Sequence, residues 1–342
     1  MAQASDDPIP TVTAYQPVPL AMRAAVRRAY GGPDQVTIET VPRPEPGAGE
    51  VLVRVRAAGL DRATLHLLTG LPYLARLALG VRRPTRAILG QQVAGEVVAV
   101  GADVSGYAVG DRVFGTADGS FAEYAVAKVS KVAATPDTVR DVDAATLGVS
   151  GTTALDAVNH VEVAAGQKVL VLGASGAVGT LVVQLAVHRG AEVTAVCSAA
   201  KLDLVRGLGA VHAADYRSTQ ITDLGGPFDA VIDIAGNRKV SQLRSVLTPT
   251  GALVIIGGEE GGPMLGGIQR NLVAALADRF TQQRLGWLFA STTTAGCAHL
   301  GELVASGVLR PPVDRQVGLD GAAAGLEAMR RGELRGHVVI CP

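Results

Sequence analysis

The stretch that decides the fold is Lys168–Gly190, KVLVLGASGAVGTLVVQLAVHRG. Its first part, Lys168–Leu172, is a short apolar run typical of a strand that is buried on both faces. A glycine-rich turn over residues 173–179 follows directly, and apolar residues then recur at helical spacing until Gly190 ends the pattern. Strand, glycine turn and helix in this order are the context that a dinucleotide-binding fingerprint requires.

The glycine turn matches the fingerprint G-x-G-x-x-G with one departure. Ala174 occupies the first glycine position, and Gly176 and Gly179 occupy the other two. Glycine lets the backbone turn tightly and approach a pyrophosphate, which binds to the free N–H groups at the helix N-terminus. A sharp strand-to-helix turn without a ligand is the alternative, but the flanking strand and helix favour a nucleotide site. The turn residues expected at the cofactor are Gly173, Ser175, Gly176, Ala177 and Val178.

Length, charge and cysteine content exclude several classes of protein. The 342 residues exceed one ordinary core and predict two domains, and 48% of them are hydrophobic. A formal net charge of zero without a long basic run argues against nucleic-acid and membrane partners. There is also no apolar stretch of transmembrane length and no signal-peptide pattern at the N-terminus. Three widely spaced cysteines can build neither a disulfide framework nor a CxxC metal site, so we expect a cytoplasmic protein.

Short β elements dominate the first part of the chain. Residues 1–20 lack periodicity and are expected to form a flexible tail, and Met22–Ala29 with Gln35–Thr40 predicts a hairpin. The Val/Arg alternation of Glu50–Leu60 is the period of a half-buried strand. Spacing of this kind indicates a compact barrel-like unit. The further strands are expected at 95–100, 111–114 and 121–126.

From about Asp141 the pattern changes to alternating helices and strands, which predicts a doubly wound parallel sheet. An amphipathic helix after the glycines at 257–258 places four apolar residues on one face, namely Ile268, Leu272, Leu276 and Phe280. The other expected helices cover 147–160, 201–208, 240–247, 299–304 and 322–329, and the other expected strands cover 191–197, 211–214, 228–235, 252–256 and 337–341.

Sequence motifs recur along nearly the whole chain, at 50–59, 93–101, 110–115, 120–126, 166–179, 208–210, 228–237, 251–258 and 334–340. Together they resemble the zinc-independent branch of the medium-chain dehydrogenases/reductases, the quinone oxidoreductase-like group. The resemblance implies an α/β protein with two domains and an active cleft between them. A GroES-like β-rich catalytic domain would comprise residues 21–145 and 291–342, and a Rossmann NADPH-binding domain would comprise residues 146–290.

The positions that hold catalytic zinc in the metal-dependent relatives are altered. Those relatives have Cys and Gly-His-Glu where this chain reads Leu60-Asp61-Arg62 and Gly90-Gln91-Gln92, and the four-cysteine structural zinc lobe is missing. Glutamine is a poor zinc ligand compared with Cys or His. We therefore expect no metal site and no alcohol dehydrogenation through a metal-bound alkoxide. Reduction of a quinone or of an activated C=C bond remains, because there the conjugated carbonyl absorbs the charge of the hydride.

The second strand of the nucleotide-binding unit indicates which cofactor binds. An NAD site usually has an acid about 20 residues past the glycines. Here that place reads Cys197 and Ser198, with Lys201 shortly after, so no carboxylate repels a 2′-phosphate and both an O–H and a cation are available. The resemblance adds Tyr216 and Arg335 to the phosphate grip. An ordinary solvated lysine is the alternative for Lys201, and the missing acid favours NADPH.

For the nicotinamide end, the resemblance points to Thr153 and to two loops at strand ends. Without it these residues would be read as ordinary turns, although the carboxyl ends of such strands are where ligands bind. The loop residues are Ala235, Gly236, Asn237, Ile256 and Gly257.

On the substrate side, relatives carry Asn, Asp and Tyr or a similar residue where this chain has Asp61, Thr64 and His66. We expect Asp61 and Thr64 to orient a carbonyl. An imidazole is a common general acid, so His66 would deliver a proton, unless it is a hydrogen-bonded loop histidine and water is the donor. The leucine-rich segment Leu67–Leu79 either lines a pocket for a bulky apolar substrate or packs in the core.

The sequence predicts an NADPH-dependent reductase of quinones or enones that acts on a small apolar carbonyl substrate. One version is a tailoring enoyl reductase acting on a polycyclic natural product. The alternative is a non-catalytic NADPH-binding protein with a redox-sensing or structural role. Arg284–Ala290 reads as an exposed edge strand, which predicts a homodimer.

Overall fold

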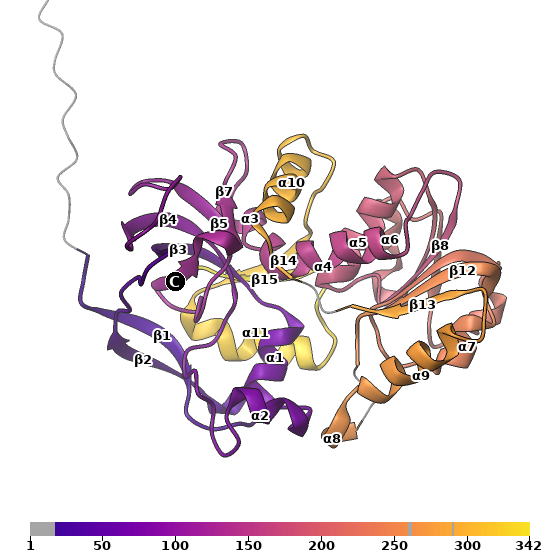
Figure 1. Ribbon diagram of the computed structural model, residues 1–342, viewed down its shortest axis with the longest axis horizontal. Coiled ribbons are helices and arrows are strands. Elements are labelled where there is room, and N and C mark those ends of the chain that lie inside the picture. Colours follow the sequence, from indigo (N-terminus) through magenta and orange to yellow (C-terminus); the bar gives the residue numbers. More distant parts are fainter. Residues whose placement is uncertain (1–17, 259–261, 289–290) are drawn as a thin grey trace, which may run out of the picture.

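The computed structural model describes residues 18–258, 262–288 and 291–342. Most of the tail expected at residues 1–20 therefore lies outside the described residues. The chain forms a β-rich half and an α/β half side by side, and its C-terminal part returns to the β-rich half (Figure 1). A GroES-like domain and a Rossmann-like domain were expected from the sequence, and this fold class is confirmed.

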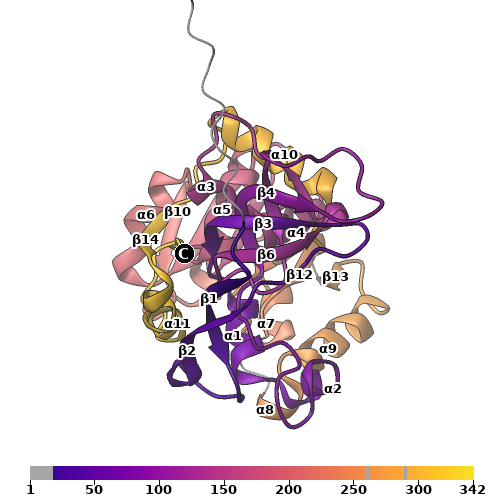
Figure 2. The same ribbon diagram turned by 90° about the vertical axis from the view of Figure 1, so that its left-hand side faces the viewer.

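The β-rich half contains the predicted hairpin and a seven-stranded sheet. Strand β1 (Ala21–Arg27) pairs with β2 (Val36–Pro42) in antiparallel register. The sheet has the order β14-β15-β3-β4-β5-β7, and β6 pairs with β3 in addition. Figure 2 shows β3 between β4 and β6. Its strands are β3 (Glu50–Gly59), β4 (Gln92–Val100), β5 (Arg112–Thr116), β6 (Tyr124–Lys128), β7 (Val132–Ala134), β14 (Val313–Val317) and β15 (His337–Ile340).

Strand β3 is the centre of this sheet. It pairs antiparallel with β4, β6 and the C-terminal strand β15, and the side chains of Val51, Val53 and Val55 lie in the core. Two strands of the sheet, β7 and β14, were not predicted from the sequence. Strand β7 is only three residues long, and Val313–Val317 is only partly buried and has three polar residues in its middle, so neither has a strong pattern. The helices of this half are α1 (Arg62–Thr69), α2 (Arg76–Leu79), α3 (Asp141–Ala144), α10 (Thr294–Ala305) and α11 (Ala322–Arg330).

The α/β half contains a six-stranded parallel sheet in the order β10-β9-β8-β11-β12-β13. Strand β8 lies between β9 on one side and β11 on the other, so the strand order reverses there. In open parallel sheets the crevice at such a reversal is the usual ligand site. The strands are β8 (Lys168–Leu172), β9 (Glu192–Cys197), β10 (His212–Asp215), β11 (Phe228–Asp233), β12 (Leu247–Ile255) and β13 (Arg284–Trp287).

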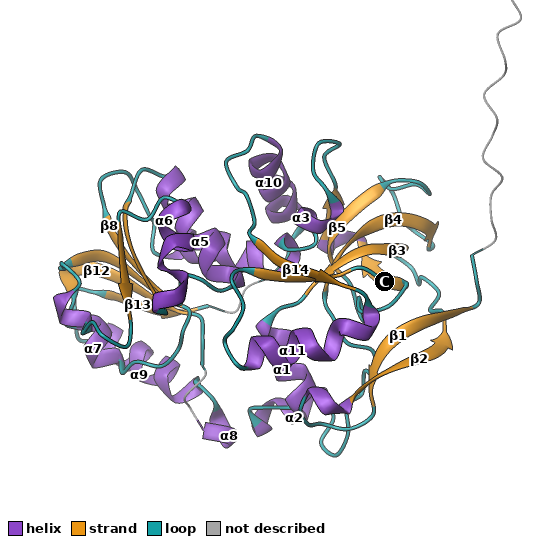
Figure 3. Ribbon diagram, turned by 180° about the vertical axis from the view of Figure 1, so that it is seen from behind, coloured by secondary structure: helices purple, strands orange, loops and turns teal. Residues whose placement is uncertain are grey.

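Helices cover both faces of this sheet. Helices α5 and α6 lie on one face and α7 and α9 on the other (Figure 3). The expected helix 147–160 is a π-helical turn, Leu147–Gly151, that continues into α4. The expected helix 240–247 ends at Arg244, because β12 begins at Leu247. The helices are α4 (Thr152–His160), α5 (Ala177–His188), α6 (Leu202–Gly207), α7 (Val240–Arg244), α8 (Gly262–Leu265) and α9 (Ile268–Asp278).

Helix α9 forms as expected, but its apolar face lies outward. Leu272 and Leu276 are each 64% exposed and Phe280 is 82% exposed, whereas Ala274 is fully buried. The helix packs on the sheet through a small residue, and the large apolar side chains remain in contact with solvent. An exposed apolar face of this kind marks an interaction surface.

Candidate active site

A cavity of about 550 Å³ lies between the two halves. It receives residues from the glycine turn, from the carboxyl ends of the parallel strands, and from α1 and the C-terminal part of the β-rich half. Nearly all the residues predicted from the sequence line it. The exceptions are Thr64, Gly236 and Arg335.

The glycine turn has the geometry of a phosphate cradle. A Cβ at Gly179 would lie 2.2 Å from the carbonyl oxygen of Gly173, so only glycine allows α5 to pack this closely against the end of β8. Gly173 has φ +84, which favours glycine. Gly176 caps α5 without a side-chain hydrogen bond, and a Cβ there would meet nothing closer than 3.7 Å. The N-terminal N–H groups of a 12-residue helix are thus available to an anion.

The C-terminal strand of the β-rich half touches this turn directly. Gly336 N donates to Ser175 O at 2.9 Å, and Gly336 forms an isolated parallel bridge with Gly176. His337 follows in β15 and is 1% exposed, and burial lowers its pKa to about 3, so its imidazole is neutral at physiological pH. The β-rich half therefore holds the turn in place through uncharged contacts.

Basic side chains gather just past the carboxyl end of β9. Lys201 Nζ donates to Gly332 O at 2.6 Å, and burial lowers the pKa of its ammonium. Arg335 Nη1 donates to Ala200 O at 3.1 Å, so Arg335 reaches the same region although it does not line the cavity. Cys197 lines the wall as a buried thiol whose pKa is raised by burial.

Two arginines at this end were missed by the sequence reasoning. Arg217 lines the cavity with its guanidinium 5.3 Å from the ring centre of Tyr216. Arg331 lines it from the end of α11 and is paired with Glu327 at 2.7 Å. Arg217 could have been predicted, because it directly follows Tyr216 in the sequence. No local sequence pattern indicates Arg331, because it reaches the cavity only through the fold of the C-terminal part.

The opposite end of the cavity lies at the strand ends of β11 and β12. Ala235, Asn237, Ile256 and Gly257 line it, whereas Gly236 packs behind them. These four residues are the ones that the sequence analysis expects at the nicotinamide end. Thr153 also lines the cavity, and its hydroxyl donates to Val149 O at 2.7 Å.

Asp61 and Thr64 form a buried pair at the start of α1. Oδ1 of Asp61 accepts from Thr64 N at 2.7 Å and from Thr64 Oγ1 at 3.0 Å, which is the pattern of a helix N-cap. Among the described residues, Oδ2 has no hydrogen-bond partner. Burial raises the pKa of Asp61 to about 6, and hydrogen bonds from Thr64 oppose the rise. Thr64 therefore acts on Asp61 and does not reach the cavity itself.

The glutamine at the altered zinc position makes hydrogen bonds within the protein. Gln92 is buried, and its Oε1 accepts from Val149 N and Ser150 N, both at 3.0 Å. Its Nε2 faces Ser150 Oγ at 3.4 Å. The side chain connects β4 to the turn before α4. It therefore has a structural role at the position where zinc-dependent relatives have Glu.

His66 lines the cavity from the last turn of α1. The following segment does not line the cavity. Leu68 is buried in the core of the β-rich half, and Tyr73, Leu74 and Leu77 are exposed. Of the two interpretations of Leu67–Leu79, core packing thus holds for Leu68, and the exposed residues fit neither.

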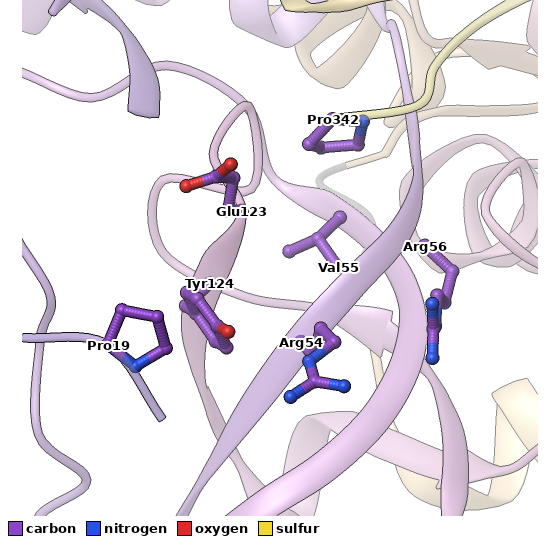
Figure 4. Close-up of a pocket in the computed structure, with 7 residues that line it drawn as sticks. All are labelled: Pro19, Arg54, Val55, Arg56, Glu123, Tyr124 and Pro342. Atoms are coloured by element: carbon purple, nitrogen blue, oxygen red, sulfur yellow. The ribbon is translucent and has the colours of Figure 1, made fainter. Parts of the chain in front are cut away.

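A second hollow of about 360 Å³ lies on the β-rich half beside β3 and β6 (Figure 4). Arg54 stacks there over the ring of Tyr124 at 5.9 Å, and Arg56 is paired with Glu96 at 3.0 Å. None of its lining residues belongs to the glycine turn or to the strand ends of the parallel sheet. The candidate active site is therefore the larger cavity between the halves.

The fold and the cavity define a two-domain oxidoreductase that binds a dinucleotide at the crevice of a Rossmann sheet. Residues 47–137 match the alcohol dehydrogenase GroES-like domain, and residues 208–340 match the zinc-binding dehydrogenase family. The chain belongs to the medium-chain dehydrogenases/reductases, in their quinone oxidoreductase-like group.

Three known proteins illustrate the relationship. The chain is 33% identical over 269 residues to the NADPH-dependent alkenal/one oxidoreductase of Arabidopsis thaliana, covering 72% of this chain and 68% of that protein. It is 30% identical over 342 residues to the quinone-oxidoreductase QR1 of Triphysaria versicolor, covering 94% of this chain and 98% of that protein. The quinone oxidoreductase structure from Coxiella burnetii matches with a TM-score of 0.84 at 27% identity, covering 94% of this chain and 99% of that one.

The buried carboxyl group of Asp61 predicts a specific pH dependence of stability. Its pKa lies near 6 in the folded protein and near 3.8 in the reference state, so the folded protein retains a proton that the unfolded chain releases. This contribution is fully present below about pH 4 and is lost as the pH rises through 6, by about 3 kcal/mol. Asp61→Asn keeps the cap acceptor and removes the titration.

We expect urea unfolding to show that Asp61→Asn gains about 3 kcal/mol relative to wild type between about pH 4 and pH 7. Asp203→Asn is the control, because the Asp203 side chain is 94% exposed. Its difference from wild type should stay nearly flat. A flat difference for Asp61→Asn as well would contradict a raised pKa.

Proposed function

We propose that this protein is an NADPH-dependent reductase of quinones or conjugated enones that works without a metal ion. The family relationship establishes an oxidoreductase related to quinone and alkenal reductases. One observation carries the proposal. The glycine turn, the basic residues Lys201 and Arg217, and the pair Asp61 and His66 all line the same cavity.

The residues present fit NADPH. The uncapped N-terminus of α5 suits the pyrophosphate, and Lys201 and Arg217 suit a 2′-phosphate where no carboxylate lines the wall. Ser198 and Tyr216 add hydroxyl groups there. When bound, NADPH supplies a hydride to the substrate. The protein supplies binding, orientation and the exclusion of water.

Zinc independence is supported by the chemistry of the donor set. The two glutamines at the altered zinc positions are poor ligands, and Gln92 already makes hydrogen bonds with Val149 and Ser150. Among the residues that the structure describes, no group of three or more His, Cys, Asp or Glu side chains is placed to hold a metal ion.

Asp61 and His66 are proposed to act on the substrate. A carboxyl group with a pKa near 6 is partly protonated near neutrality and is then a hydrogen-bond donor for a carbonyl oxygen. His66 comes from the same helix and lines the same cavity, which supports its proposed role of protonating the carbon atom next to that carbonyl. Thr64 holds Asp61 in position, and Thr153 lines the wall beside the turn that precedes α4.

The test of the proposed reaction is isotopic. With NADPH deuterated at C4 and a cyclic enone, we expect the label at the β-carbon and a solvent proton at the α-carbon. Label at the carbonyl carbon would show a different reaction class. No turnover with any quinone or enone, together with tight NADPH binding, would favour the non-catalytic alternative.

His66→Phe tests the source of the proton in the same assay. If His66 is the acid, we expect kcat to fall by roughly 10²-fold, the scale of general acid catalysis, while NADPH affinity stays unchanged. An unchanged kcat would assign the proton to water.

We expect NADPH to bind at least about tenfold more tightly than NADH, which corresponds to about 1.4 kcal/mol. Lys201→Ala should remove most of this difference and leave NADH affinity nearly unchanged, because NADH lacks the 2′-phosphate. Fluorescence titration measures both. Lys168→Ala is the control, since Lys168 is an exposed lysine at the start of β8 that does not line the cavity. Equal affinities in the wild type would refute the phosphate grip.

We also propose a homodimer built on the edge of the parallel sheet. Strand β13 (Arg284–Trp287) pairs with β12, and among the described residues no strand covers its other edge. The expected strand extended to Ala290, and residues 289 and 290 lie outside the described residues. The exposed leucines of α9 lie next to this edge, so a second copy would bury both features across a two-fold axis.

Light scattering at micromolar concentration should therefore give the mass of a dimer. Leu276→Asp places a charge in the proposed interface and should give a monomer. Leu77→Asp is the matched control, because Leu77 is 74% exposed on the other half of the molecule. A monomeric wild type would refute the proposal.

The remaining proposal is a cytoplasmic location. All three cysteines are unpaired, and two of them, Cys197 and Cys297, are buried as free thiols, which suits a reducing compartment. No described helix is long and apolar enough to cross a membrane.

A further inference from the structure

A buried ion pair lies directly behind the strand-end loops of the cavity. Asp233 is the last residue of β11 and is fully buried. Its Oδ2 accepts from Arg270 Nη2 of α9 at 2.5 Å, and the Arg270 side chain is 12% exposed. A charge at such a depth requires a partner, because an unpaired buried carboxylate is strongly destabilising.

The pair also holds the two loops that follow β11 and β12. The second carboxylate oxygen of Asp233 accepts from Gly236 N at 3.1 Å, and Arg270 Nη1 donates to Gly257 O at 3.3 Å. The backbone adds to this connection, since Ile256 N donates to Asp233 O at 2.9 Å. Arg270 thus bridges one loop directly and the other through Asp233.

The two loops touch each other so closely that they must move together. Gly236 has φ +71, and a Cβ there would lie 2.5 Å from the carbonyl carbon of Gly257. The residues on either side of this contact, Ala235, Asn237 and Ile256, line the cavity. A shift of the guanidinium would therefore move this part of the cavity wall.

We propose that Arg270 is a positioning residue that fixes the nicotinamide end of the cofactor site, acting through Asp233 and the two loops. The proposal rests on the proposed NADPH-dependent reduction. Arg270 does not line the cavity, so its effect is on the position of the loops and not on the reacting atoms.

The planar fork of arginine is what this role requires. One nitrogen neutralises Asp233 and another holds the carbonyl of Gly257. A lysine ammonium supplies the charge but lacks the fixed fork that reaches both acceptors. Arg270→Lys therefore separates neutralisation of a buried charge from positioning of the loops.

The experiment compares wild type, Arg270→Lys and the control Arg279→Lys, which changes an exposed arginine just past the end of the same helix. We expect Arg270→Lys to keep the wild-type melting temperature and to bind NADPH within about threefold, because the phosphates bind at the other end. It should lower kcat by about 10- to 100-fold, the scale of a small misplacement of reacting groups. Arg279→Lys should match wild type in every measurement.

A second measurement does not need turnover. The fluorescence anisotropy of the bound nicotinamide should be lower in Arg270→Lys than in wild type, because a loosened wall lets the ring move. Lower anisotropy in an enzyme that reduces no quinone or enone would support the positioning role and refute the proposed reaction. Wild-type kcat and anisotropy in Arg270→Lys would overturn the positioning role, as would a loss of kcat that only follows a loss of thermal stability.

Discussion

The contact between helix α5 and the end of strand β8 is the constraint on which the site depends. The helix can approach because residue 179 is glycine, and a single Cβ there would collide with the carbonyl of Gly173. Close approach brings the uncapped N-terminus of α5 to the place where the strand order reverses. The electrostatic field of the helix and the crevice of the sheet therefore coincide, and both favour a bound pyrophosphate.

The same turn also couples the two halves of the molecule. Gly336 of the β-rich half bonds to Ser175, and the neutral, buried His337 follows it in β15. A parallel bridge of glycines, Gly176 with Gly336, allows the two backbones to meet without side chains between them. The C-terminal strand pairs in turn with β3, the central strand of the other sheet, so the glycine turn is connected to the core of the β-rich half through backbone contacts.

Much of this arrangement follows from local sequence. The run Lys168–Leu172 and its glycine turn predicted the strand, turn and helix correctly, because each of them has a clear local sequence pattern. The outward apolar face of α9 and the approach of Arg331 to the cavity could not be predicted, because both depend on how distant segments pack. Arg335 and Thr64 show a further limit of prediction from sequence. Their neighbourhood was predicted, but which side chains form the cavity wall depends on rotamers and burial.

Burial gives this chain a carboxyl group that suits the proposed metal-free reaction. A zinc ion stabilises the charge that develops on a carbonyl oxygen, and a neutral carboxylic acid can stabilise it by donating a hydrogen bond. An exposed aspartate is ionised at neutral pH and cannot donate. Asp61 is 2% exposed, and this raises its pKa to about 6 although Thr64 supplies two opposing hydrogen bonds. The N-cap of α1 fixes one oxygen, and among the residues that the structure describes the other has no hydrogen-bond partner, which suits the proposed donation of a proton to a carbonyl.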